Sequence, residues 1–174
     1  MNEECLSLLT IQQIIIDECI RAISYERNFQ TRERTNFYKF TGGSFTKIVV
    51  IQWCQLFGNK SEQIHWSKLH LPEDFPIFDR QSILNVTGFD DSKWEDYHKD
   101  MRFMRDKFFG HFDMTHLRGH IPSFEPALKM LLAYRQHLCS VIKHINEHVQ
   151  GKFVTQAFDD NDILIEKINN ELRR

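Results

Sequence analysis

The stretch that decides the fold spans residues 124–149 and reads FEPALKMLLAYRQHLCSVIKHINEHV. Its apolar residues recur at three- and four-residue steps, the period of one face of an α-helix. Pro122 and Ser123 precede the pattern, and Gly151 follows it, so we expect one helix reaching about Gln150. At about 1.5 Å per residue, this helix spans about 40 Å, the length of a helical bundle. The apolar stripe consists of Phe124, Leu128, Leu131, Leu138, Ile142, Ile145 and Val149.

The helical period continues on both sides of this stretch. Leu6, Leu9, Ile16 and Ile20 share one spacing pattern and predict a first helix over residues 4–28. Further helices are predicted over 74–86, ending at Thr87-Gly88, over 92–110, capped by Asp90-Asp91-Ser92, and over 160–173, beginning at Asp159-Asp160. Residues 59–73 are expected to form a loop with a short helical piece at 66–69.

The region between these helices contains a predicted break. Residues 27–40 are charged and aromatic, and they fit either an extension of the first helix or an excursion. Thr41-Gly42-Gly43 predicts an interruption, after which Ser44 is expected to cap a very apolar helix that Gly58 closes. Residues 48–51 have β propensity, but they lie within a longer helical pattern, which favours a helix.

The amino-acid composition limits the fold classes and the kinds of binding partner that are expected. The 174 residues include only 7 glycines and 4 prolines, too few for the many tight turns of a β-sandwich. The net charge of −2 provides no global field for nucleic acid, so any such contact requires a local basic patch. We expect a single all-α domain over residues 1–174, folded as an up-and-down antiparallel helical bundle.

The sequence also predicts the cellular location of the protein. No apolar run approaches the roughly 20 residues of a membrane span, and the N-terminus carries Glu3 and Glu4 instead of basic residues. The four cysteines form no C-x-x-C pair and lie beside apolar residues in helical stretches, as core thiols of a reducing compartment do. We therefore expect a cytoplasmic protein without membrane segments. The cysteines are Cys5, Cys19, Cys54 and Cys139.

The segment richest in chemistry follows Trp94, Tyr97, Met101 and Met104, an apolar stripe that Phe108 continues. On an ideal helix at about 100° per residue, Arg105 lies about 50° from the centre of this stripe and His111 about 70° away on the other side. A guanidinium at the edge of a packed face needs a partner or a water-lined cleft. In one interpretation Arg105 pairs with a nearby carboxylate and His111 caps a helix end. In the other, Arg105 binds phosphate oxygens and His111 transfers a proton.

Arg105 and His111 enclose five residues, and the stretch Arg105-Asp106-Lys107-Phe108-Phe109-Gly110-His111-Phe112-Asp113 resembles the RDKxxAHxD motif of HEPN-superfamily proteins linked to abortive infection. Gly110 replaces the usual small alanine. The upstream residues 52–58, followed by His65-Trp66, are similar to a WCxLFG…HW block of the same group. The resemblance covers residues 45–140 and implies a HEPN-like helical bundle.

The resemblance also implies an activity. Catalytic HEPN proteins are metal-independent ribonucleases whose site forms between two copies of the motif helix, without a cofactor. Here the RNA 2′-OH would attack the adjacent phosphorus, with Arg105 holding the phosphate, His111 as general acid or base and Asp106 orienting either side chain. The resemblance thus implies a homodimeric endoribonuclease of a phage-defence or toxin–antitoxin system, with an antitoxin or nucleotidyltransferase partner. Because many members are inactive, a non-catalytic interaction module is the alternative, and a helical small-molecule-binding regulator is a third.

Other side chains are candidates for RNA contact. Arg102 and Lys107 flank Arg105 and are expected to contact phosphates. His65 and Trp66 lie in a loop, where they would either stack on a base or close the end of the bundle. A mixture of basic and aromatic residues is expected to form a partner or dimer surface more than an RNA surface. It comprises Arg27, Phe29, Arg32, Arg34, Phe37, Tyr38 and Lys39.

Histidines gather in two places, but we expect no metal site. His111, His116 and His120 lie within ten residues, and His144 and His148 form an i, i+4 pair. Such pairs can chelate a metal, yet no cysteine or carboxylate accompanies them at a defined spacing. Solvated or capping histidines are the interpretation that the sequence favours.

Overall fold

A computed structural model describes residues 3–30, 35–71, 75, 77–110, 121–148 and 161–172. Its α-helices are α1 (Glu3–Gln30), α2 (Asn36–Trp53), α3 (Arg80–Thr87), α4 (Asp91–Met104), α5 (Glu125–His148) and α6 (Asn161–Leu172). Short helical pieces of other types occupy Cys54–Gly58, Trp66–Lys68 and Arg105–Gly110, and the described residues contain no strand. The predicted all-α helical bundle is confirmed.

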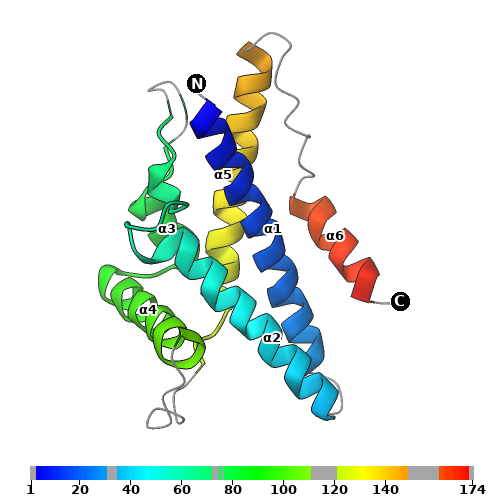
Figure 1. Ribbon diagram of the computed structural model, residues 1–174. Helices are drawn as coiled ribbons and strands as arrows, with labels where there is room; N and C mark the ends of the chain where they lie inside the picture. Colours follow the sequence, from blue (N-terminus) through cyan, green and yellow to red (C-terminus); the bar gives the residue numbers. More distant parts are fainter. Residues whose placement is uncertain are drawn as a thin grey trace.

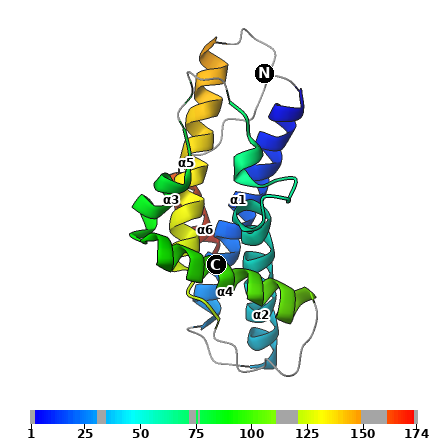
Figure 2. The ribbon, with the colours of Figure 1, turned by 90° about the vertical axis from the view of Figure 1, so that its left-hand side faces the viewer.

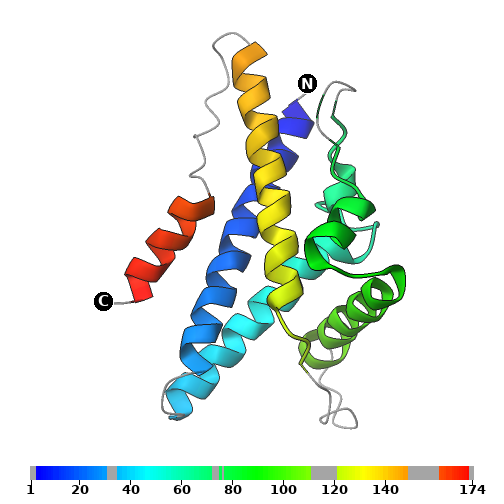
Figure 3. The same ribbon diagram turned by 180° about the vertical axis from the view of Figure 1, so that it is seen from behind.

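Three long helices form the centre of the molecule. α1 descends from the N-terminus, α2 returns beside it, and α5 rises along α1 in the opposite direction (Figure 1). α3 and α4 lie on one side of this centre, and α6 lies on the other, as the view from behind also shows (Figure 3). Seen from the side, α4 crosses obliquely in front of α2 and α5 (Figure 2). None of the helices in the described ranges is long and apolar enough to span a membrane.

The core gathers around Trp53 at the end of α2. Its indole is fully buried and lies within 6.2 Å, centroid to centroid, of the rings of Phe57, Trp94, Tyr97 and His98. Large aromatic side chains contribute much of the apolar area that folding removes from water. This ring cluster therefore fastens α4 to the end of α2 and fixes the position of the residues that follow α4.

Replacing Trp53 by Ala is expected to lower the free energy of unfolding by about 3–5 kcal/mol. The substitution leaves a cavity that the four surrounding rings cannot move in to fill. Denaturant unfolding of the purified variant measures this loss. Trp53→Phe keeps most of the ring and should lose less. Phe40→Ala, at a side chain that is 79% exposed, should change stability by no more than about 0.5 kcal/mol. A loss below about 1 kcal/mol for Trp53→Ala would contradict the central role of this indole.

The predicted break at Thr41-Gly42-Gly43 is wrong, and so is the cap at Ser44. α2 runs through both glycines. The hydroxyl of Ser44 donates to the Phe40 carbonyl at 3.0 Å, and that of Thr46 donates to the Gly42 carbonyl at 3.1 Å. These side chains bond back into the helix instead of starting a new one. Packing of α2 against α1 outweighs the roughly 1 kcal/mol by which each glycine disfavours a helix.

Most other boundaries agree with the predictions to within two residues. α3 begins at Arg80, six residues later than predicted, because Asp79 caps it: its carboxylate accepts from the Ser82 amide at 2.8 Å. Gly88 ends α3 in the left-handed conformation (φ 71°), as expected. The short helical piece at Trp66–Lys68 is confirmed. Residues 31–34 and the expected cap at Asp159-Asp160 lie outside the described residues.

Candidate functional site

The candidate site lies at the C-terminal end of α4. The Asp90 carboxylate caps this helix by accepting from the Lys93 amide at 2.8 Å, which confirms the acidic start. The apolar stripe is also confirmed as far as it is described, since Trp94, Tyr97, Met101 and Met104 are all buried. These buried side chains pack α4 against the core. They thereby fix the position of Arg105, which directly follows the last turn of α4.

The motif itself is not an α-helix. Residues Arg105–Gly110 form a π-helix, in which each turn contains one more residue than in an α-helix. The ideal angle of 100° per residue therefore fails beyond Met104, and the predicted regular helix over 92–110 is wrong in its last six residues. Isolated π-helical turns occur frequently at functional sites in proteins.

Two carboxylates hold the Arg105 guanidinium. Its Nε donates to Asp106 Oδ1 at 2.8 Å, and its Nη1 donates to Glu62 Oε1 at 3.3 Å. The side chain is 22% exposed, so it lies at the edge of the packed face, as its position in the sequence predicts. The hydrogen bond to Asp106 is the main reason that the pKa of Arg105 is raised above its ordinary value. Nη2 makes no hydrogen bond to any described residue.

The end of α2 forms the wall beside Arg105. Residues Cys54–Gly58 are a second π-helix, and a methyl group on Gly58 would lie 3.9 Å from Arg105 Nη1. Gly58 does end the helical run, but not as the expected left-handed cap, because Gly88 is the only described glycine with positive φ. A Cβ at this position would make ordinary van der Waals contact with the guanidinium.

His98 joins α4 to the π-helix Cys54–Gly58 at the end of α2. Its Nε2 lies 3.1 Å from the Phe57 carbonyl and 3.0 Å from the Gly58 carbonyl, so this nitrogen carries the proton and donates to both. The Cys54 thiol donates to the Met101 carbonyl at 3.5 Å. Burial raises the pKa of this thiol to about 12, so Cys54 packs as a neutral core residue.

A hollow of about 400 Å³ lies beside the motif on the outer face of α4. Lys99, Arg102 and Asp106 are among its lining residues. The Nε of Arg102 is buried and has no hydrogen-bond partner in the described part of the chain. Lys107 is exposed in the π-helix. The structure therefore brings Arg102 and Lys107 near the pair Arg105–Asp106, with three cationic side chains within one and a half turns.

His111 and the other two histidines at 116 and 120 lie outside the described residues. The described part of the candidate site thus consists of the cation Arg105, its two carboxylates and the neighbouring Arg102 and Lys107. The pairing of Arg105 with nearby carboxylates, one of the two interpretations of its position, is present.

His65 and Trp66 have structural contacts of their own. His65 is 3% exposed, and its Nδ1 accepts from the Ser67 amide at 3.2 Å, which caps the short helix Trp66–Lys68. A base cannot stack on this ring while it is buried, so the expectation of RNA stacking at His65 is corrected. Trp66 is half-buried and packs against Phe78 with ring centroids 5.7 Å apart. These contacts support the alternative in which the two residues close a local part of the bundle.

The protein should lose stability on acidification because of His65. Burial lowers the pKa of His65 to about 4, below the value of about 6.5 in an unfolded chain. Between these values the unfolded state binds the proton and the folded state does not. His65 therefore favours unfolding as the pH falls from about 6.5 to 4, by up to about 3 kcal/mol. Denaturant unfolding at several pH values measures this slope.

The matched control for this prediction is His65→Asn. Asparagine keeps a side-chain acceptor at the cap position but does not titrate. The variant should show a shallower decrease in stability over the same pH range, and the remaining slope should come from other groups such as His137, whose pKa burial also lowers. Equal slopes for the two proteins would contradict the role of His65.

Other predicted candidates remain apart from the site. Arg27 pairs with Glu125, and Phe37 is 66% exposed on α2, whereas Arg32 and Arg34 lie outside the described residues. The ring of His144 packs on Phe75 at 4.3 Å. Within the described ranges, no group of three or more histidine, cysteine or acidic residues could hold a metal ion.

Glu62 is the site residue that the sequence did not reveal. It lies 43 positions before Arg105, in a turn where the Glu62 amide donates to the Asn59 carbonyl and the Glu62 carbonyl accepts from the His65 amide. A single carboxylate in a polar loop carries no periodic signal. Only the need of Arg105 for a partner pointed to such a residue.

Comparisons with family models, with curated proteins and with solved structures find no match for this chain.

Proposed function

We propose that the protein is an endoribonuclease that cleaves RNA without a metal ion. The observation that carries this proposal is the anchored Arg105: two of its nitrogens are bound by Asp106 and Glu62, while Nη2 makes no bond to a described residue. A guanidinium held in this way can receive a phosphate oxygen without reorganising. The resemblance of residues 105–113 to the HEPN motif supports the same assignment.

The chemistry follows from these side chains. The ribose 2′-OH attacks the adjacent phosphorus, the bond from phosphorus to the 5′ oxygen of the next nucleotide breaks, and a 2′,3′-cyclic phosphate forms. Arg105 stabilises the negative charge that develops on the phosphoryl oxygens. His111 removes the proton from the 2′-OH or gives one to the leaving 5′ oxygen, and water takes part in the other proton transfer. Asp106 holds Arg105, and Arg102 and Lys107 contact neighbouring phosphates.

The proposal includes a second copy of the chain. The cleavage site is composite, with the Arg105 segments of two protomers facing one RNA strand. The expected partners are an antitoxin or a nucleotidyltransferase, in a phage-defence or toxin–antitoxin setting.

A second candidate function is a non-catalytic interaction module. The same ion pairs favour it, because the charge of Arg105 is balanced within one chain by Asp106 at 2.8 Å and Glu62 at 3.3 Å. In that case the three residues lock the end of α4 to the loop after α2, and the pairs serve the fold.

The test is cleavage of single-stranded RNA by the purified full chain, in the presence and absence of chelator. The proposal expects cleavage that chelator does not change, no cleavage of the same sequence made with 2′-deoxyribose, and cyclic phosphate ends. Sedimentation should show a dimer at micromolar concentration. No cleavage of any RNA by a dimer would favour the interaction module, and a strict monomer that cleaves RNA would remove the composite site.

Glu62 provides a further prediction. Glu62→Ala should lower the rate of RNA cleavage about tenfold, because Arg105 Nη1 then loses one charge-assisted hydrogen bond. Glu62→Gln keeps an oxygen acceptor and should retain most of the rate. Single-turnover cleavage measures both variants. A Glu62→Ala protein that cleaves faster than the unchanged protein would show that Glu62 competes with phosphate instead of positioning Arg105.

A further inference from the structure

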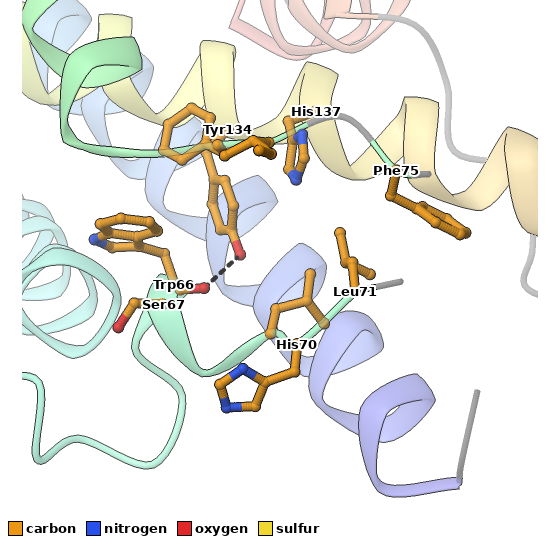
Figure 4. A pocket seen from close by; sticks show the side chains of 10 residues that line it. Trp66, Ser67, His70, Leu71, Phe75, Tyr134 and His137 are labelled. Atoms are coloured by element: carbon orange, nitrogen blue, oxygen red, sulfur yellow. Dashed lines mark hydrogen bonds between the residues drawn. The ribbon is translucent and has the colours of Figure 1, made fainter. Parts of the chain in front are cut away.

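A cavity of about 440 Å³ lies away from Arg105, between α5 and the segment 66–78. We call it the His137 pocket. Figure 4 shows Tyr134 and His137 projecting from α5 on one side, and Trp66, Ser67 and Leu71 on the segment across from them. The volume falls within the range of about 300–1,000 Å³ that is typical of small-molecule sites in proteins.

The wall of the His137 pocket is aromatic. Trp66, Phe75, Phe78 and Tyr134 all line it. The Tyr134 and His137 rings are stacked, with centroids 5.9 Å apart and an interplanar angle of 16°, and Phe78 lies 5.6 Å from His137. Tyr134 is 1% exposed and packs on other rings, so the partly exposed rings of Trp66, Phe78 and His137 are the faces available to a planar ligand that stacks.

The described residues that line this pocket include no aspartate, glutamate, lysine or arginine. A charged ligand would therefore gain no charged partner from these described residues. A neutral, planar ligand suits this wall better than a phosphate or an ammonium group.

His137 supplies the polar groups. Burial lowers the pKa of its imidazole, which is neutral at pH 7 and so presents one N–H donor and one nitrogen acceptor. The ring makes contacts with other rings, but its nitrogens bond to no described residue. The two nitrogens point in divergent directions, so one of them at a time can exchange a hydrogen bond with the donor or acceptor groups on the edge of a nucleobase.

We propose that the His137 pocket binds a nucleobase, which stacks on the aromatic wall and exchanges a hydrogen bond with the imidazole of His137. The base belongs either to a free nucleoside or to a strand of RNA. This site requires no cleavage chemistry, so it stands independently of the proposed ribonuclease.

The experiment is calorimetric titration of the full chain with adenosine, guanosine, cytidine and uridine in turn, with ribose as the sugar control. At least one nucleoside should bind with a dissociation constant near or below about 1 mM, and ribose should not. His137→Phe keeps a ring but removes both nitrogens, and it should weaken binding about tenfold. Gln136→Ala, at the exposed neighbouring position on α5, should leave binding unchanged.

A second variant separates binding from folding. Leu71→Trp fills the cavity from the wall across from α5 and should abolish nucleoside binding without altering His137. Competition with an RNA oligonucleotide distinguishes the sources: displacement of the nucleoside by RNA assigns the base to a strand, and its retention assigns the site to a free nucleoside. The proposal is overturned if none of the four nucleosides binds. It is also overturned if His137→Phe binds a nucleoside as tightly as the unchanged protein does, whether or not the protein cleaves RNA.

Discussion

Replacing Arg105 by Ala is expected to lower RNA cleavage by about 10²–10³-fold, the loss that follows removal of one preorganised donor to a developing negative charge. The guanidinium is held by Asp106 and Glu62, so no other described cation is positioned to replace it in the same orientation. Single-turnover cleavage of a labelled RNA measures the effect. The fold should survive, because partly exposed ion pairs contribute about 1 kcal/mol or less.

Arg105→Lys is the matched control. Lysine keeps the charge but has no planar fork, so it cannot bond Asp106, Glu62 and a phosphate at once. We expect its rate to lie between those of the unchanged protein and Arg105→Ala. If Arg105→Ala cleaves RNA at the full rate, Arg105 serves only the fold, and the interaction module becomes the better assignment.

His111→Ala should lower cleavage by about 10²–10⁴-fold, because positioned proton transfer contributes that much to a rate. The sequence places His111 directly after Gly110, beyond the buried stripe that packs α4 on the core. Its substitution should therefore cost little stability, which thermal unfolding measures.

The control for His111→Ala is a substitution away from the motif and from the His137 pocket. Glu147→Ala, at an exposed position near the end of α5, should cleave RNA at the unchanged rate. Cleavage that survives His111→Ala would remove this residue from the mechanism. Cleavage that disappears with chelator in the unchanged protein would instead point to metal chemistry.

The helices were predictable from the sequence because short-range features, namely the period of the apolar residues and the capping residues, determine them. The stripe Trp94, Tyr97, Met101 and Met104 has the helical period, and all four side chains are buried. Asp90 and Gly88 act through side-chain capping and a left-handed turn, which need only neighbouring residues. Where a signal is local and no tertiary contact opposes it, sequence and structure agree.

The failures have non-local causes. Gly42 and Gly43 weaken a helix locally, but packing of α2 on α1 keeps the helix continuous. The π-helix over Arg105–Gly110 has no periodic signature, because the period of the preceding stripe is that of an α-helix. The partnership of Arg105 with Glu62 joins two segments 43 residues apart, so no spacing rule could supply it.

The wide turn at Arg105–Gly110 has a consequence for how the spacing of this segment is compared between sequences. A π-helical turn is equivalent to an α-helical turn with one inserted residue. A chain with an α-helical turn in this place would therefore need one residue fewer between its arginine and the end of the turn. A search that demands a single fixed spacing after the arginine would overlook such a chain.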